Sequence, residues 1–227
     1  MSTSTRWTVA VVVVVVALGV ALWTQLGDSG SPTGSIGPSQ ARDRRDADTA
    51  EALAGPRARA DLLPCPGAGT GPGSEQSPEP RSQALRGITL ECAGDGSPVD
   101  VAKAVAGRPI VLNLWAYWCA PCAEELPAMA EYQRRAGPGV TVLTVHQDEN
   151  EAAALLRLAE LGVRLPTLQD GRRLVAAALR VPNVMPATVV LRADGSVAEV
   201  LPRSFASADE IAAAVGPKVG QKTGEPG

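Results

Sequence analysis

Residues 115–127 read Trp-Ala-Tyr-Trp-Cys-Ala-Pro-Cys-Ala-Glu-Glu-Leu-Pro, and they place a Cys-x-x-Cys motif between two differently patterned segments. The apolar run Ile110–Leu114 before the motif predicts a buried strand, and Glu124–Arg135 after it predicts a helix. Cys119 therefore falls at a helix N-terminus, where free N–H groups and the helix dipole favour a thiolate. Cys122 follows one turn later, close enough for a disulfide. Such a pair can exchange its disulfide with another molecule through a mixed disulfide.

Length and charge limit what the chain can be. Its 227 residues allow one domain of ordinary size together with tails. The net charge of -3 is small and no basic block stands out, which argues against nucleic acid as a partner. The four cysteines are Cys65, Cys92, Cys119 and Cys122.

The N-terminal segment Trp7–Trp23 is an uninterrupted apolar run that spans roughly 25 Å as a helix, close to a bilayer core. It predicts an uncleaved signal anchor over residues 7–23, with residues 1–6 cytoplasmic because Arg6 precedes it. The expected localisation is the cell membrane, with a single pass and an extracytoplasmic C-terminal domain. A cleaved signal peptide is the main alternative, although Ala21-Leu22-Trp23 is a poor cleavage site. A buried helix of a soluble protein is the third.

Composition divides the remainder into segments. The stretch after the apolar run has almost no large apolar side chains and cannot offset the entropy of ordering, although Glu51–Ala60 has some helix-forming pattern. The predicted segments are a flexible linker at 24–61, an arm with Cys65 at 62–84, a globular domain at 85–216 and a disordered tail at 217–227.

The globular part alternates between strand and helix patterns. The predicted strands are 85–92, 98–101, 110–115, 140–146, 165–168, 187–191 and 197–201, and the predicted helical segments are 100–105, 119–136, 149–161, 171–179 and 207–215. Right-handed crossovers place the first strands in a parallel sheet with helices on both faces. The last two strands form a hairpin around Asp194-Gly195 and add an antiparallel edge. The predicted fold class is α/β with a central mixed sheet.

The motif and the order of elements together resemble the thioredoxin fold and, within it, the membrane-anchored TlpA/ResA-like thiol–disulfide proteins. The resemblance covers about Leu85 to Val215. The matching residues are Leu112–Cys122, Glu125, Pro127 and Val184–Thr188. The resemblance implies a thioredoxin-like fold and a thiol–disulfide oxidoreductase, with no metal and no organic cofactor.

The resemblance also implies roles within the motif. Cys119 is expected to attack the substrate and Cys122 to resolve the mixed disulfide. Asn113 stands where cytosolic thioredoxins have a buried, proton-carrying aspartate, so another group must carry the proton. Glu125 matches the active-site glutamate of the TlpA/ResA-like proteins, and partial burial would raise its pKa. The alternatives are a solvated surface acid at Glu125, and a pair of inert thiols or a zinc site at the cysteines.

Three further residues are expected to contact the substrate. Met185-Pro186 matches the loop with a cis-proline beside the dithiol, and the backbone of Met185 would pair with an extended substrate segment. Pro182 is the competing trans proline. Trp118 is expected to cover the disulfide, whereas Trp115 has core packing as an equal alternative.

Cys65 and Cys92 remain as an even pair, which predicts a structural disulfide outside the cytoplasm. A second redox pair that relays electrons is the rival interpretation. His146 is the only histidine. A structural role is expected for it, with a catalytic or metal-binding role as the alternative.

These residues predict a membrane-tethered enzyme that exchanges disulfides with protein substrates outside the cytoplasm. By resemblance the direction is reduction, for example of apocytochrome c cysteines in cytochrome c maturation, with a CcdA/DsbD-type membrane protein as electron donor. A disulfide-forming oxidant is an alternative in the same class, because Ala120-Pro121 between the cysteines does not settle the direction. A Cu(I)-binding chaperone module is the alternative from another class.

Overall fold

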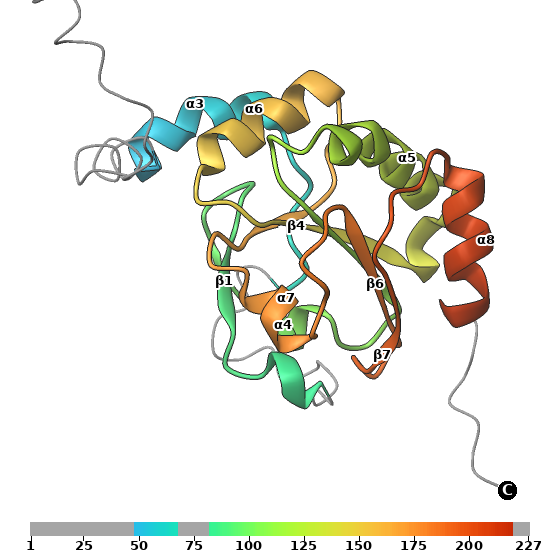
Figure 1. Cartoon of the computed structure of the whole chain (residues 1–227). Coiled ribbons are helices and arrows are strands. Elements are labelled where there is room, and N and C mark those ends of the chain that lie inside the picture. The colour runs from blue at the N-terminus through green and yellow to red at the C-terminus, as the bar shows by residue number, and fades with distance from the viewer. Residues whose placement is uncertain (1–47, 68–81, 220–227) are drawn as a thin grey trace, which may run out of the picture. The chain divides into compact units, whose positions relative to one another are not determined.

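A computed structural model describes residues 48–67 and 82–219 (Figure 1). The strands in these ranges are β1 (Thr89–Cys92), β2 (Pro98–Asp100), β3 (Ile110–Trp115), β4 (Thr141–His146), β5 (Thr167–Gln169), β6 (Ala187–Leu191) and β7 (Val197–Leu201). The helices are α3 (Ala50–Ala60), α4 (Val101–Ala104), α5 (Ala120–Ala136), α6 (Glu151–Leu161), α7 (Leu174–Ala178) and α8 (Ala208–Val219), with short 3-10 turns at Gln83–Leu85 and Gly137–Gly139.

The strands form one mixed sheet in the order β2-β1-β5-β4-β3-β6-β7. The central strands β3, β4 and β5 are parallel, and β6 and β7 add the expected antiparallel hairpin. The predicted mixed sheet is therefore confirmed. The expectation that the first strands join the parallel part is wrong for β1, which is antiparallel to both β2 and β5. A tight turn joins β1 to β2, and such hairpins are antiparallel.

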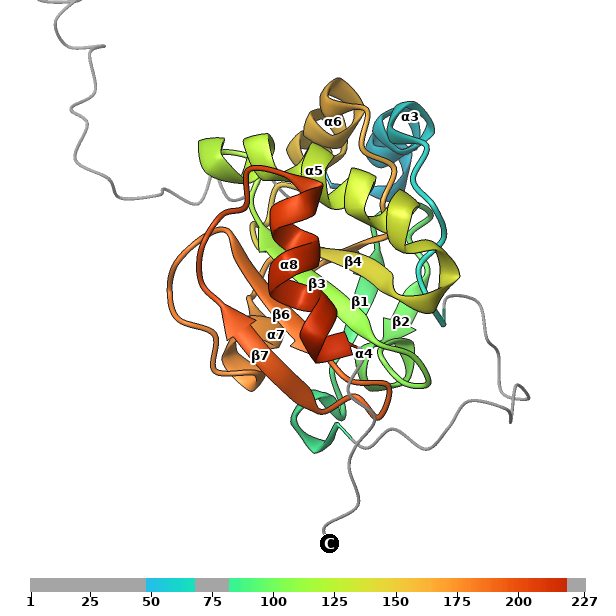
Figure 2. The same ribbon diagram turned by 90° about the vertical axis from the view of Figure 1, so that its right-hand side faces the viewer.

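Strand β3 divides the core and places the site. All six of its side chains are buried, and they alternate between the two faces of the sheet. Leu112 and Leu114 pack in the cluster that contains α4 and α7, whereas Val111 and Trp115 pack in the cluster that contains α5 and α8. Figure 2 looks onto this second face, with α8 and α5 in front of the sheet. Asn113 has the same parity as Val111 and Trp115, so it faces α5.

The predicted segment boundaries need three corrections. The linker expected at 24–61 includes α3, which lies beside α6 and buries Leu53 and Ala60 against it (Figure 1). Helix α8 continues to Val219, into the tail expected at 217–227, and the remainder of that tail lies outside the described residues. The first strand starts at Thr89, after the turn at residues 83–85. Each correction extends a helix or turn into a polar segment, where tertiary contacts outweigh weak local propensity.

The predicted anchor at 7–23 and its cytoplasmic flank lie outside the described residues. Within the ranges that the structure describes, no helix has both the length and the apolar character needed to cross a membrane.

Candidate redox site

The Cys-x-x-Cys motif forms a disulfide at the start of α5. The Cys119 and Cys122 sulfurs are 2.04 Å apart. Cys119 is the N-cap of the helix, and its Sγ accepts a hydrogen bond from Cys122 N at 3.3 Å. Pro121 occupies the first helical turn, where its missing N–H costs no hydrogen bond. When the disulfide is open, the same free N–H groups and the helix dipole stabilise a thiolate on Cys119.

Glu125 lies one turn after Cys122 on the same helix and is fully buried. Asn113 Nδ2 donates to its Oε2 at 2.7 Å, and Phe205 N donates to its Oε1 at 2.9 Å. Burial raises the pKa of Glu125 to about 7, although both donors and the charge of Arg203 oppose the shift. The alternative of a solvated surface acid is wrong for Glu125.

Asn113 holds the carboxylate through one end of its amide only. Its Oδ1 is buried without a hydrogen-bond partner. Because an amide can rotate by half a turn, Asn113 can donate to the carboxylate or accept from the protonated acid. Asn113, whose amide cannot carry a proton itself, can therefore hydrogen-bond to Glu125 in both protonation states of the carboxyl group.

A hollow of about 460 Å³ lies beside the disulfide. Its walls are Trp118, Cys119, Ala120, Pro121, Gln147, Arg173, Asn183, Val184 and Met185. Trp118 is 58% exposed, and its Nε1 donates to Asp148 Oδ2 at 3.0 Å. The indole therefore forms a fixed wall of the hollow beside Cys119 and leaves it open.

The cis peptide bond expected before Pro186 is present. It is the only cis peptide bond among the described residues. Met185 lines the hollow, while Pro186 is buried behind it. The competing proline, Pro182, follows a trans bond. The structure therefore brings Met185 to the wall that also contains Cys119.

His146 has structural partners on both ring nitrogens. Its Nδ1 pairs with Gln169 Oε1 at 2.9 Å, and its Nε2 accepts from Tyr117 N at 3.4 Å. Burial lowers its pKa, which keeps the ring neutral. Trp115 is fully buried with its ring centroid 4.9 Å from that of His146. Both side chains therefore support the loop before Cys119 from inside the core, and no group of metal-ligating side chains occurs in the described ranges.

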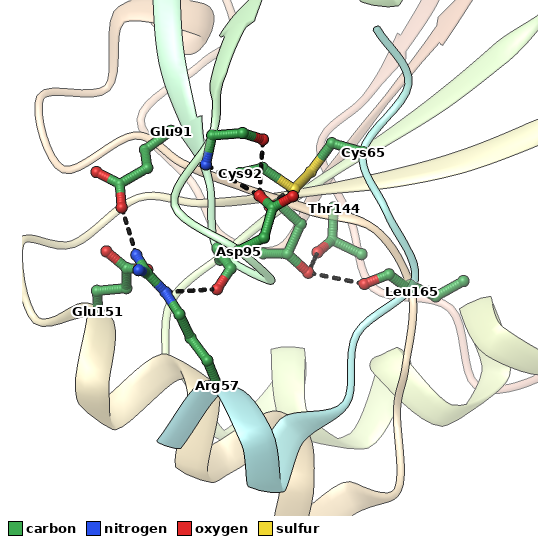
Figure 3. The surroundings of a disulfide bond; sticks show 11 residues. Arg57, Cys65, Glu91, Cys92, Asp95, Thr144, Glu151 and Leu165 are labelled. Carbon is green, nitrogen blue, oxygen red and sulfur yellow. Dashed lines mark hydrogen bonds and ion pairs between the residues drawn. A yellow bond between two sulfur atoms is a disulfide. The ribbon is translucent and has the colours of Figure 1, made fainter. Parts of the chain in front are cut away.

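The second cysteine pair forms a disulfide away from the hollow. Cys65 and Cys92 are joined at 2.02 Å and are 4% and 0% exposed. The bond attaches the arm after α3 to the end of β1 (Figure 3). Neither cysteine starts a helix. The pairing is the predicted one.

An arginine beside this disulfide was not singled out from the sequence. Arg57 of α3 donates to Ala93 O at 3.2 Å and to Glu151 Oε1 at 3.0 Å, and it also binds Glu91 (Figure 3). Burial raises the pKa of Glu151 to about 7, opposed by Arg57. These contacts join α3, β1 and α6, which are far apart in sequence, so no local pattern pointed to them.

The sequence analysis also did not identify Gln147, Arg173 and Asn183 as residues of the site. Gln147 directly follows β4, and residues at the carboxyl ends of parallel strands commonly meet at a site. That signal was available for Gln147. Arg173 and Asn183 lie in loops around α7 and have no comparable sequence signal.

The sheet order, the disulfide at the start of α5 and the cis-proline loop define a thioredoxin-fold protein with a dithiol site. The Redoxin family matches residues 76–211, which is more than half of the chain. The chain belongs to the Redoxin family.

Individual relatives agree with this assignment. The chain is 32% identical over 96 residues to the thiol-disulfide oxidoreductase ResA of Bacillus subtilis (strain 168), a match covering 42% of this chain and 53% of that protein. The chain spans 53–60% of the length of the first ResA proteins that it matches. The predicted resemblance to the TlpA/ResA-like thioredoxin-fold oxidoreductases is confirmed.

Two solved structures have the same fold. One is a secreted disulfide oxidoreductase of Mycobacterium tuberculosis homologous to E. coli DsbE, with 26% identity, a TM-score of 0.51, and coverage of 59% of this chain and 97% of that chain. The other is a secreted thiol-disulfide isomerase of Corynebacterium glutamicum, with 27% identity, a TM-score of 0.52, and coverage of 60% and 86%.

Proposed function

We propose that the chain is a thiol–disulfide oxidoreductase that exchanges the Cys119–Cys122 disulfide with protein substrates. The observation that carries the proposal is the disulfide at the start of α5, with Cys119 in the wall of an open hollow and Cys122 fully buried. A substrate sulfur can approach Cys119 from the hollow, whereas Cys122 is reached only from Cys119. The ResA relatives, which are named as thiol-disulfide oxidoreductases, support the same activity.

The first step of substrate reduction uses the Cys119 thiolate. Its sulfur attacks one sulfur of a substrate disulfide, a Cys119–substrate disulfide forms, and the second substrate sulfur leaves as a thiolate that takes a proton from water. The helix N-terminus lowers the cost of the attacking anion. Met185 lines the same hollow, and we propose that its backbone pairs with the substrate segment on either side of the cysteine.

The second step uses Cys122 and Glu125. The Glu125 carboxylate accepts the Cys122 proton, and the Cys122 thiolate attacks Cys119 Sγ. The enzyme disulfide forms, and the substrate leaves as its second thiolate. The overall result is one substrate disulfide reduced to two thiols and one enzyme dithiol oxidised. A carboxyl group whose pKa is about 7 can take and return this proton at neutral pH.

We propose reduction as the physiological direction, with apocytochrome c cysteines as one substrate class and a CcdA/DsbD-type membrane protein as the electron donor. Support comes from the resemblance to the TlpA/ResA-like proteins. We further propose that the apolar run at 7–23 anchors the chain in the cell membrane and that the catalytic domain is extracytoplasmic. The pairing of Cys65 with Cys92 supports an oxidising compartment.

The reduction potential of Cys119–Cys122 in the full chain tests the direction, with Cys119→Ser as the control. We expect a value below about −230 mV, as in the reducing members of this fold. A value above about −150 mV would instead identify a disulfide-forming oxidant. If the control titrates like the wild type, the redox pair lies elsewhere and the proposed site is wrong.

A further inference from the structure

The hollow beside Cys119 has a polar wall that the proposed chemistry does not use. Gln147, Arg173 and Asn183 form this wall, beside the apolar side chains of Trp118 and Val184. Among the described residues that line the hollow, only Arg173 carries a charge.

The guanidinium of Arg173 is held in place by two amides. Its Nε donates to Gln147 Oε1 at 3.3 Å, and its Nη1 donates to Asn183 Oδ1 at 2.5 Å. Its backbone has φ 57°, a left-handed conformation that an arginine adopts only when the surroundings hold it. The two amide contacts therefore orient the guanidinium at the wall.

Arg173 interacts electrostatically with the buried carboxylate of Asp170, but within the described ranges it has no carboxylate in direct contact with its guanidinium. Both of its side-chain partners are neutral, and it takes part in no ion pair of the described residues. The carboxylate of Asp170 accepts from Leu174 N and Val175 N at the start of α7. Of the five N–H groups of Arg173, three remain for a ligand.

Gln147 adds a second donor without a partner. The residue is only 5% exposed, and its Nε2 makes no hydrogen bond. The Oε1 of the same amide already accepts from Arg173, so the Nε2 cannot exchange places with it without losing that bond. A buried donor left unpaired is costly, so an acceptor that reaches Nε2 would stabilise the bound state.

We propose that this polar wall selects substrate segments that carry an aspartate or glutamate within a few residues of the reacting cysteine. The inference rests on the proposed function and names its substrate class. A carboxylate matches the planar fork of Arg173 and can also accept from Gln147. Asp148 forms no ion pair with Arg173 among the described residues, and its two oxygens accept from Trp118 Nε1 and Asn150 N.

Three synthetic peptides with one internal disulfide test the proposal. They differ only in two flanking residues, which are glutamate, glutamine or lysine. The reduced full chain is mixed with each, and kcat/KM is divided by the rate of the same peptide with dithiothreitol, which removes differences in intrinsic reactivity. We expect the glutamate peptide to react about fivefold faster than the glutamine peptide at low salt, and the lysine peptide to react most slowly.

Two glutamine variants locate the effect. In Arg173→Gln the ratio of glutamate to glutamine peptide should fall to about one. Arg172→Gln removes the exposed neighbouring charge, which does not line the hollow, and should keep the wild-type ratio. Arg173→Lys keeps the charge without the fork, and we expect about half of the preference to be lost.

Each contrary result has one meaning. Equal rates with the three peptides in the wild type, or a preference that survives in Arg173→Gln, overturns the acidic selectivity and leaves the proposed function intact. An unchanged preference in Arg173→Lys contradicts the role of the fixed fork. If the wild type reduces none of the peptides, the proposed function itself fails and this inference fails with it.

Discussion

The two disulfides of this chain are almost equally buried and differ in nearly everything else. Cys119 and Cys122 are 5% and 0% exposed, and Cys65 and Cys92 are 4% and 0% exposed. The first pair is three residues apart at a helix N-terminus beside a hollow, and the second is 27 residues apart between an arm and a strand. Burial therefore does not distinguish a redox disulfide from a structural one, whereas the helix end and the access route do.

The two buried glutamates make the same point. Burial raises the pKa of both Glu125 and Glu151 to about 7. Glu125 is bonded to neutral donors one turn from Cys122, whereas Glu151 is bonded to Arg57 beside the other disulfide. Equal pKa shifts therefore accompany different roles: we propose proton transfer for Glu125, whereas the ion pair of Glu151 with Arg57 holds α3 against α6.

The largest effect should separate the two disulfides by activity. Cys119→Ser removes the attacking sulfur, and we expect the rate of insulin disulfide reduction to fall by about 10³-fold or more. The double variant Cys65→Ser with Cys92→Ser should stay within about twofold of the wild type, because its sulfurs do not reach the hollow. Loss of activity in the double variant, with its fold intact by circular dichroism, would support the electron-relay interpretation.

Stability should show the opposite order. Opening the Cys65–Cys92 loop of 27 residues frees the unfolded chain, and we expect the double variant to lose roughly 3–4 kcal/mol of unfolding free energy. The three-residue separation of Cys119 and Cys122 predicts a smaller loss for Cys119→Ser. Urea unfolding of both variants measures this. A greater loss in Cys119→Ser would contradict the stabilising role assigned to Cys65–Cys92.

Because of Glu125 and Glu151, we expect the free energy of unfolding to fall as pH rises. Each folded-state pKa lies above the ordinary value of 4.5, so the folded chain binds more protons than the unfolded chain between about pH 4.5 and 7. Unfolding free energy should fall across this window and then level off. Glu125→Gln should remove about 3 kcal/mol of this fall, judged by urea unfolding at pH 5 and pH 8.

Glu151→Gln should remove a comparable share of the same fall, because burial raises the pKa of Glu151 to about 7 as well. It should also lower stability at pH 8, because Arg57 then keeps only Glu91 as an ion-pair partner among the described residues. A stability profile identical to the wild type in both variants would show that neither carboxyl group titrates near neutral pH in the folded chain.

The resolving step should distinguish the two glutamates by rate. Glu125 can accept the Cys122 proton only above its pKa, so release of a thiol from a Cys119 mixed disulfide should accelerate as pH rises through about 7. In Glu125→Gln we expect about tenfold slower release at pH 7.5 and no rise near pH 7. Stopped-flow release of a chromogenic thiol measures it. Glu151→Gln is the matched control, and an altered profile there would break the comparison.

Local patterns predicted much of this molecule. The helix that starts after Cys119, the strand Ile110–Trp115 and the hairpin around Asp194-Gly195 depend on short-range periodicity and turn residues, and all three are present. The cis bond before Pro186 and the resemblance to a known family followed from short motifs. With four cysteines in the chain, one possible pairing remained once Cys119 and Cys122 were assigned to each other.

The tertiary structure decided which distant groups meet. Phe205 N reaches Glu125 from 80 residues away, and Asn113 reaches it because β3 places every second side chain against α5. Other contacts also join segments far apart in the chain. They are the packing of α3 on α6, the antiparallel pairing of β1 with β5, and the hydrogen bond between Arg173 and Gln147. The sequence by itself determined most of the elements and the reactive cysteines, because these depend on neighbouring residues. Only the packing of the elements decided the surroundings that set proton affinity and substrate access, because those depend on strand register and helix placement.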